Sequence, residues 1–172
     1  MTTPRLKISR QALDDLTAHV IKGFETKYKK EAGGHLLGYR DKKGFYVSRA
    51  IPYNTPYRTR TGWGINLYYF RRKGLLLETK RLKWIGTYHS HVEIKRSAST
   101  GQSREDKEAH LFSDRPVDMI VRITNCRMRS PKTCLSYQEI RDSHGYFFDI
   151  CGFVKDQQEK ITLMRVEQTA RK

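Results

Sequence analysis

The chain has 172 residues, and its 34 Lys and Arg against 18 Asp and Glu give a formal net charge of +16. No stretch approaches the roughly 20 uninterrupted apolar residues of a membrane helix, and the start lacks the apolar block of a secretory signal. These features argue against membrane-spanning helices and predict a single cytoplasmic domain, 1–172, that is long enough to bury a core.

The positive charge indicates the kinds of partner that the surface would attract. A basic surface favours nucleic acid, acidic proteins or anionic lipid, but basic residues spread along a chain, as here, also form ordinary solvated surfaces. The three cysteines, Cys126, Cys134 and Cys151, are odd in number and irregularly spaced. We expect buried, reduced thiols, and neither a disulfide framework nor a metal knuckle.

Helical and extended patterns alternate along the chain, which predicts an α/β (α+β) domain with its core at about 8–166. Helices are predicted where apolar residues recur at helical spacing: 9–28 with Ser9 as N-cap, 66–82 with Gly74 as its weak point, and 103–113. Strands are predicted where β-branched and aromatic residues dominate: after Gly33, and at 44–51, 83–88, 117–124, 134–140, 145–153 and 160–166. The ends, 1–8 and 167–172, are expected to be a short leader, with Lys7 and Ile8 at a sheet edge, and a frayed polar tail.

Two histidines follow the apolar run at 83–88. His89 and His91 are one residue apart, so an extended strand points both side chains to the same side. Asp106, at the start of the next helix, would add a third ligand and leave the fourth position open, which is the arrangement of catalytic zinc. Ser103-x-x-Asp106 also has the form of a capping box, and the two interpretations are compatible.

Two features outside this stretch are ambiguous when taken alone. Glu31, which precedes two glycines, is either a solvated side chain or the general base that such a metal site needs. The loop 57–64 is rich in Arg, Thr and Gly and carries Trp63. The indole either grips a substrate or folds back on the core.

Together these motifs resemble the JAMM metalloprotease family, also called JAB or MPN+. The matching motifs occur in the family's order and span roughly residues 10–125: Glu31-x-Gly-Gly-His-Leu-Leu-Gly, Pro52-x-Asn54, Ile85-Gly-Thr-Tyr-His89-Ser90-His91 and Ser103-x-x-Asp106. The resemblance implies an MPN/JAB-like fold, a mixed, mostly antiparallel sheet flanked by helices. It also implies one catalytic Zn²⁺ held by His89, His91 and Asp106, with Glu31 as general base and Ser103 stabilising the oxyanion during amide hydrolysis.

The sequence departs from the family pattern in the loop after the second histidine. The family usually has seven residues before the serine, a spacing that here leads to Ser99 and puts Gln102 at the ligand position. Because an amide cannot serve as the acidic ligand, we assign Ser103 and Asp106, in a loop four residues longer. Val92 stands where the family commonly has proline.

Members of the family cleave after the C-terminal glycine of ubiquitin or ubiquitin-like proteins. Small stand-alone prokaryotic members process precursors or remove conjugates, and some act beside activating and transfer enzymes in anti-phage operons. The resemblance therefore implies a deubiquitinase-like peptidase or isopeptidase whose basic surface steers an acidic ubiquitin-like partner. We expect the 92–102 loop and the 57–64 loop to hold the substrate's tail. Two alternatives are a RadC-like nucleic-acid-associated protein and a non-catalytic MPN scaffold, although scaffolds typically lose the metal ligands.

Overall fold

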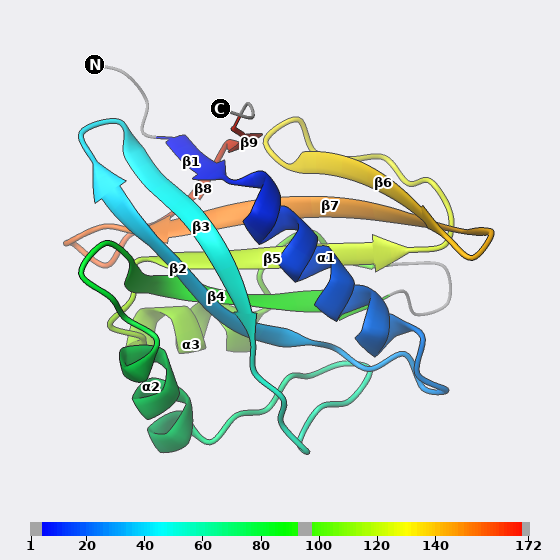
Figure 1. Ribbon diagram of the computed structural model, residues 1–172, viewed down its shortest axis with the longest axis horizontal. Helices are drawn as coiled ribbons and strands as arrows, with labels where there is room; N and C mark the ends of the chain where they lie inside the picture. The colour runs from blue at the N-terminus through cyan, green and yellow to red at the C-terminus, as the bar shows by residue number, and fades with distance from the viewer. Residues whose placement is uncertain (1–4, 93–97, 170–172) are drawn as a thin grey trace.

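The computed structural model describes residues 5–92 and 98–169, and within these ranges it contains a nine-stranded sheet and three helices (Figure 1). The strand order is β6-β7-β5-β4-β2-β3-β1-β9, and β8 pairs with β7. The strands are β1 (Arg5–Ile8), β2 (Gly33–Asp41), β3 (Gly44–Pro52), β4 (Lys83–Val92), β5 (Val117–Thr124), β6 (Leu135–Arg141), β7 (His144–Lys155), β8 (Ile161–Met164) and β9 (Val166–Gln168). Parallel pairing joins β4 to β5 and β1 to both β3 and β9, and the other pairs are antiparallel. The chain is thus a mixed α/β protein with a large, mostly antiparallel sheet.

The sheet curves until its two ends approach each other. The backbone N–H of Val166, at the β9 end, donates to the carbonyl of Thr133 just before β6 (3.0 Å). Leu6 of β1 lies over Gly152 of β7, where an added Cβ would come within 2.2 Å of the leucine side chain. Glycine at position 152 therefore permits this close approach, and the sheet is nearly barrel-like.

Helix α1 (Arg10–Phe24) covers one face of the sheet. Ser9 caps it, since its hydroxyl oxygen accepts a hydrogen bond from the backbone N–H of Ala12 (3.0 Å). The helix packs its apolar face against β3, β4 and β5 and contributes to the main core. It ends at Phe24 and not at the predicted residue 28, because the Gly23 carbonyl accepts from the backbone N–H of Lys30 in a turn (3.1 Å).

The other two helices are α2 (Leu67–Leu76) and α3 (Arg104–Phe112), and Figure 1 shows α3 on the opposite side of the sheet from α1. Helix α2 is shorter than the predicted 66–82. A turn stops it, in which the Thr79 hydroxyl accepts from the backbone N–H groups of Arg81 and Leu82 (3.3 and 3.0 Å). None of the helices in the described ranges has the length and apolar character that crossing a membrane requires.

Both chain ends contain strands that the sequence predicted only in part. Residues 5–8, expected to belong to a leader with Lys7 and Ile8 at a sheet edge, form β1, which lies between β3 and β9 with Leu6 and Ile8 fully buried. Residues 167 and 168, expected in a frayed tail, belong to β9. The sheet pairing of Lys7 and Ile8 is confirmed, but the leader and the frayed tail were wrong, because pairing between distant segments orders both. Residues 1–4 and 170–172 lie outside the described residues.

The cysteine prediction was also wrong. Cys134 and Cys151 form a disulfide, with their Cα atoms 4.4 Å apart. They face each other where the β6–β7 register continues one position beyond the Leu135–Ile150 pair. Cys126 is free but exposed. The irregular spacing in the sequence concealed the pair, because the antiparallel register of two strands, and not a sequence motif, brings the two sulfurs together.

Candidate metal centre

Strand β4 presents both candidate histidine ligands on one face. It extends to Val92, so His89 and His91 lie inside the strand. The predicted strand, 83–88, placed them just after its end. The alternate residues Tyr88 and Ser90 point the other way and are fully buried: Tyr88 lies in the main core, and the Ser90 hydroxyl accepts a hydrogen bond from the Ala32 backbone N–H (2.9 Å). The serine between the histidines is thus a structural residue.

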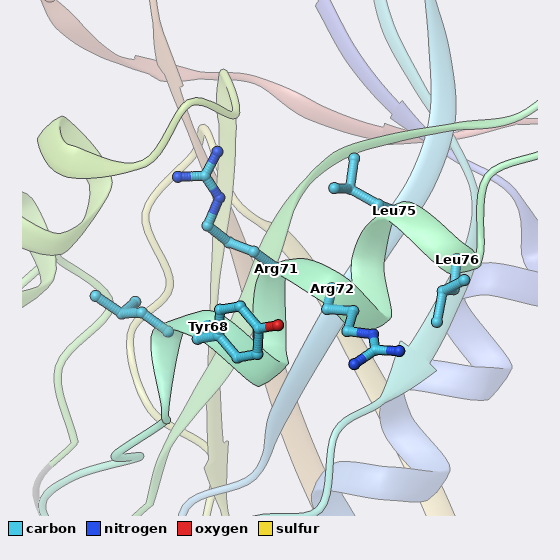
Figure 2. A pocket seen from close by; sticks show the side chains of 6 residues that line it. Tyr68, Arg71, Arg72, Leu75 and Leu76 are labelled. Atoms are coloured by element: carbon cyan, nitrogen blue, oxygen red, sulfur yellow. The ribbon is translucent and has the colours of Figure 1, made fainter.

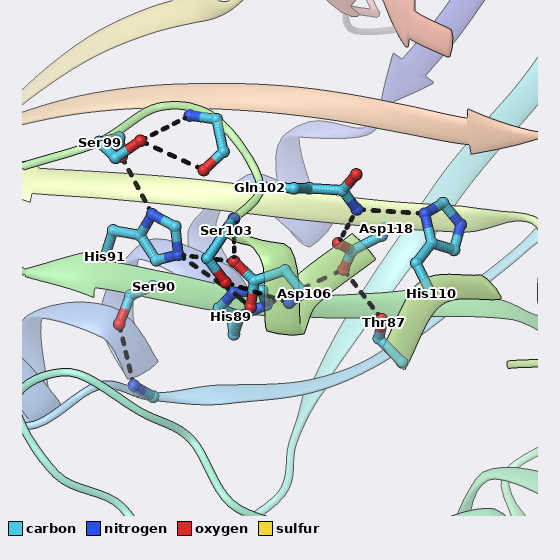
Figure 3. Close-up of polar contacts among 12 residues, drawn as sticks. Thr87, His89, Ser90, His91, Ser99, Gln102, Ser103, Asp106, His110 and Asp118 are labelled. Carbon is cyan, nitrogen blue, oxygen red and sulfur yellow. Dashed lines mark hydrogen bonds and ion pairs between the residues drawn. The ribbon is translucent and has the colours of Figure 1, made fainter. Parts of the chain in front are cut away.

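His89, His91 and Asp106 converge in a tight cluster, which Figure 3 shows. The Nε2 atom of His89 lies 3.1 Å from Oδ1 of Asp106, and Nε2 of His91 lies 3.3 Å from Oδ2. The two Nε2 atoms are 3.2 Å apart. One ligand atom from each residue falls within 4.8 Å of the others. The structure therefore brings together the three residues predicted to hold the metal.

A capping box at the start of α3 holds the carboxylate of the cluster. The Ser103 hydroxyl oxygen accepts from the Asp106 backbone N–H (3.1 Å), and Oδ2 of Asp106 accepts from the Ser103 backbone N–H (2.7 Å). The cap leaves the hydroxyl hydrogen of Ser103 available to another acceptor. The same two residues thus make a helix cap and lie at the cluster of His89, His91 and Asp106.

Glu31 reaches the site from the segment before β2. Its backbone N–H donates to the carbonyl of Thr59 (2.7 Å), and Ala32 beside it accepts a hydrogen bond from the Ser90 backbone N–H (2.7 Å). The side chain is 6% exposed. Burial raises the pKa of Glu31 to about 7, although the two histidines pull it down. A carboxyl group with such a pKa can both take and return a proton near neutral pH.

Hydrogen bonds and charges within the cluster strongly shift the pKa values of its members. Burial alone would lower the pKa of His89, but its hydrogen bond with Asp106 and the nearby charge of Asp118 raise that pKa to about 9. Burial would raise the pKa of Asp106, but the hydrogen bonds with both histidines outweigh it and hold that pKa well below its usual range. A divalent cation would replace the proton in this arrangement, so metal binding would release protons.

A second layer of polar groups, which the sequence did not predict, lies behind His89. Oδ1 of Asp118 accepts from the Thr87 hydroxyl (3.0 Å) and lies 3.9 Å from Nδ1 of His89. Oδ2 of Asp118 accepts from the Gln102 side-chain amide (2.7 Å), which also contacts Nδ1 of His110 (3.1 Å). The signal that could have revealed this layer is a charged residue inside the otherwise apolar run 117–121.

The family's usual spacing would put Ser99 and Gln102 at the site in place of Ser103 and Asp106, and the structure shows where both residues lie. Gln102 is turned away from the histidine pair and hydrogen-bonded in the second layer. The Ser99 carbonyl lies 3.2 Å from Nδ1 of His91, while its hydroxyl hydrogen-bonds within its own loop. Ser103 and Asp106 lie beside the histidines, which is where the assignment with the longer loop put them.

The loop 57–64 lies next to the same site. Trp63 is partly buried, its indole plane is within 5° of the His89 ring plane, and the ring centroids are 6.4 Å apart. An added Cβ at Gly33 would come within 2.6 Å of the indole. Of the two predicted orientations, the structure thus shows Trp63 folded back. The predicted role of the 92–102 loop involves residues 93–97, which lie outside the described residues.

The donor atoms fit a zinc ion. Two imidazole nitrogens and a carboxylate oxygen are a known catalytic zinc set, with one position left for water. The second ring nitrogen of His91 is held by a backbone carbonyl, and that of His89 faces a carboxylate. Such outer contacts orient the rings, so that each Nε2 points to the place where a metal would bind.

No protein-family model and no curated protein matches the chain. Among solved structures, the chain is similar to the solution structure of protein DSY2949 from Desulfitobacterium hafniense. The two share 15% sequence identity over 96% of this chain and 94% of that chain, with a TM-score of 0.55. At this identity the likeness concerns the fold alone.

Proposed function

We propose that the chain is a zinc-dependent peptidase or isopeptidase of the JAMM type, with an MPN/JAB-like fold. Its substrate is a ubiquitin-like protein, cleaved after the C-terminal glycine. The observation that carries the proposal is the meeting of three elements at one point. Strand β4 supplies His89 and His91, the first turn of α3 supplies Asp106, and the segment before β2 supplies the buried Glu31. A purely structural zinc site would not need a raised carboxyl pKa beside it.

The residues divide the chemistry of amide hydrolysis among them. His89, His91 and Asp106 would hold Zn²⁺, which when bound supplies Lewis-acid activation of water and of the scissile carbonyl. Glu31 takes the proton from the attacking water and returns it to the leaving amine. Ser103 donates its hydroxyl hydrogen to the developing oxyanion. Ser90 takes no part in the chemistry, since its hydroxyl is buried in a backbone contact.

A protein-sized substrate accords with the exposed surface of α2. Figure 2 shows the side chains that line a hollow of about 610 Å³ on this helix: Leu67, Tyr68, Arg71, Arg72, Leu75 and Leu76. Tyr68 is 67% exposed and Leu76 is 74% exposed. Clustered exposed apolar residues mark protein interaction sites, and the interleaved arginines favour an acidic partner.

The test is cleavage of a panel of ubiquitin-like fusions, each with a reporter after the C-terminal glycine, followed by mass spectrometry of the products. We expect cutting directly after that glycine. Glu31→Gln should abolish cleavage while zinc is retained, and Glu105→Gln, an exposed acid on the first turn of α3, should leave cleavage unchanged. Full activity in the Glu31→Gln protein would refute the proposal.

The net charge of +16 favours one other function, association with nucleic acid. That function predicts binding to duplex DNA with a steep salt dependence, since each neutralised phosphate releases counterions. Tight DNA binding by a chain that cleaves none of the fusions would favour this second function.

A further inference from the structure

A row of polar side chains crosses the sheet at the level of the second histidine. His91 of β4 is in register with Arg122 of β5, Arg122 with Asp149 of β7, and Asp149 with Ser136 of β6. Partners in register point to the same face of a sheet, so the row continues the metal cluster sideways across four strands. Neither the zinc cluster nor the proposed proton transfers use its three outer members.

The centre of this row is a buried ion pair. Arg122 and Asp149 are 6% and 5% exposed. Nε of Arg122 donates to Oδ2 of Asp149 (2.9 Å), and the Ser136 hydroxyl donates to Oδ1 (2.7 Å). Desolvation costs so much that a buried pair often stabilises a fold no better than apolar residues would. Its stability contribution alone therefore does not explain the pair.

The remaining donors of the guanidinium reach two loops. Nη2 of Arg122 donates to the carbonyl of Arg129 in the segment after β5 (2.9 Å), and Nη1 donates to the carbonyl of Ala98 (3.5 Å). Ala98 precedes Ser99, whose carbonyl lies 3.2 Å from Nδ1 of His91. Because a carbonyl can only accept, Nδ1 of His91 donates in this contact, and the contact turns Nε2 toward Asp106 and the cluster.

We propose that Arg122 is a positioning residue for the metal ligand His91. Asp149 and Ser136 fix the guanidinium, the guanidinium holds the Ala98–Ser99 segment, and the Ser99 carbonyl fixes the orientation of the His91 ring. The Ala98–Ser99 segment is the described part of the loop that contacts both Arg122 and His91. The inference rests on the proposed function only in taking His91 as a metal ligand.

The test is Arg122→Lys, which keeps the charge opposite Asp149 but lacks the fork that reaches two carbonyls at once. We expect zinc affinity to fall about 10-fold, the usual size of an outer-contact effect. In the metal-free protein, ¹H–¹⁵N spectra of the ring should show a His91 Nδ1–H signal that is weaker and exchanges faster with water, because its carbonyl acceptor is no longer held in place. The control Arg141→Lys, which alters the ion pair with Glu139 on β6, should leave both readouts unchanged.

Wild-type zinc affinity and an unchanged His91 ring signal in Arg122→Lys would overturn the inference. If circular dichroism shows that this variant does not fold, the same two measurements on Asp149→Asn decide, with a weaker hold on Arg122 expected to lower zinc affinity severalfold. Neither readout requires a substrate, so a chain that binds zinc but cleaves no fusion would sink the proposed peptidase and leave this test standing.

Discussion

Glu31 is held at the candidate site at a cost to the fold. Its pKa lies near 7 in the folded chain and near 4.5 in an unfolded one. Between these values the folded state binds more protons, so the stability that this group contributes is present below pH 4.5 and is lost as the pH rises to about 7. A polar group suited to catalysis is thus destabilising at neutral pH.

Replacing this carboxyl should therefore stabilise the metal-free protein. We expect the stability of wild type relative to Glu31→Gln to fall by roughly 1–3 kcal/mol between pH 5 and pH 8, because the neutral amide has no charge to desolvate. Urea unfolding in the presence of a chelator measures the difference. The Glu105→Gln control should follow wild type at both pH values. An equal pH dependence in wild type and Glu31→Gln would contradict the raised pKa.

The charged residues of β5 show what a single sequence does and does not disclose. His89, His91 and Asp106 could be found from their spacing, because strand alternation and helix capping are local rules. Asp118 and Arg122 lie beside the histidine strand only because β5 pairs with β4 in parallel in one register. No local pattern specifies that register, so these residues were missed.

At the scale of the helix, the cap of α3 carries a structural and a chemical role. Ser103→Ala removes the acceptor for the Asp106 backbone N–H, and should lower the free energy of unfolding by about 1 kcal/mol. Cleavage should fall about 100-fold or more if the hydroxyl also stabilises the oxyanion. Ser103→Thr retains the hydroxyl and should restore both. Thermal unfolding and fusion cleavage measure the two effects, and a fully active Ser103→Ala protein would remove Ser103 from the mechanism.

Helix α2 depends on a glycine that helix propensity alone would disfavour. Ala in place of Gly74 would gain about 1 kcal/mol of propensity, but its Cβ would lie 2.5 Å from the Trp84 ring and 2.9 Å from the His35 ring. Overpacking of this kind costs about 1–3 kcal/mol. We therefore expect Gly74→Ala to be destabilising, as measured by urea unfolding, and Gly62→Ala, whose nearest neighbour is 3.6 Å away, to be neutral. A stabilised Gly74→Ala protein would contradict this packing.

Helix starts were predicted better than helix ends. Ser9 and Ser103 each precede an apolar pattern and cap α1 and α3 in the structure. The ends of α1 and α2 were placed too late, because turns around Gly23 and Thr79 stop the helices while the apolar pattern continues. Capping side chains are visible in a sequence, whereas competing turn hydrogen bonds depend on later residues.

For the whole molecule, the sequence predicted a mixed α/β fold but not its curvature. The near closure depends on β1 and β9, which pair in parallel although they lie at opposite ends of the chain. Each strand is only a few residues long, so its own sequence does not predict that it pairs with the other and completes the sheet. The disulfide between Cys134 and Cys151 is similarly a product of the strand register.

The net charge belongs to the whole surface and should raise the rate at which an acidic substrate associates with it. If the substrate is acidic, kcat/KM for a ubiquitin-like fusion should fall severalfold between about 50 and 500 mM salt, while kcat stays constant. Initial rates measure both. A short peptide with the same cleavage site but no folded body is the control and should show little salt dependence. Equal salt dependence for fusion and peptide would assign the effect to the site and not to steering.

In the proposed function, three side chains from β4 and α3 hold a catalytic zinc. Zinc content per chain, measured on protein purified without added metal and then equilibrated with zinc, tests it most directly. We expect one zinc per chain in wild type, and none in His89→Ala or Asp106→Ala, with the ion retained in Asp114→Ala just beyond α3. Full zinc occupancy in a folded Asp106→Ala protein would contradict the assignment of the third ligand and the site as a whole.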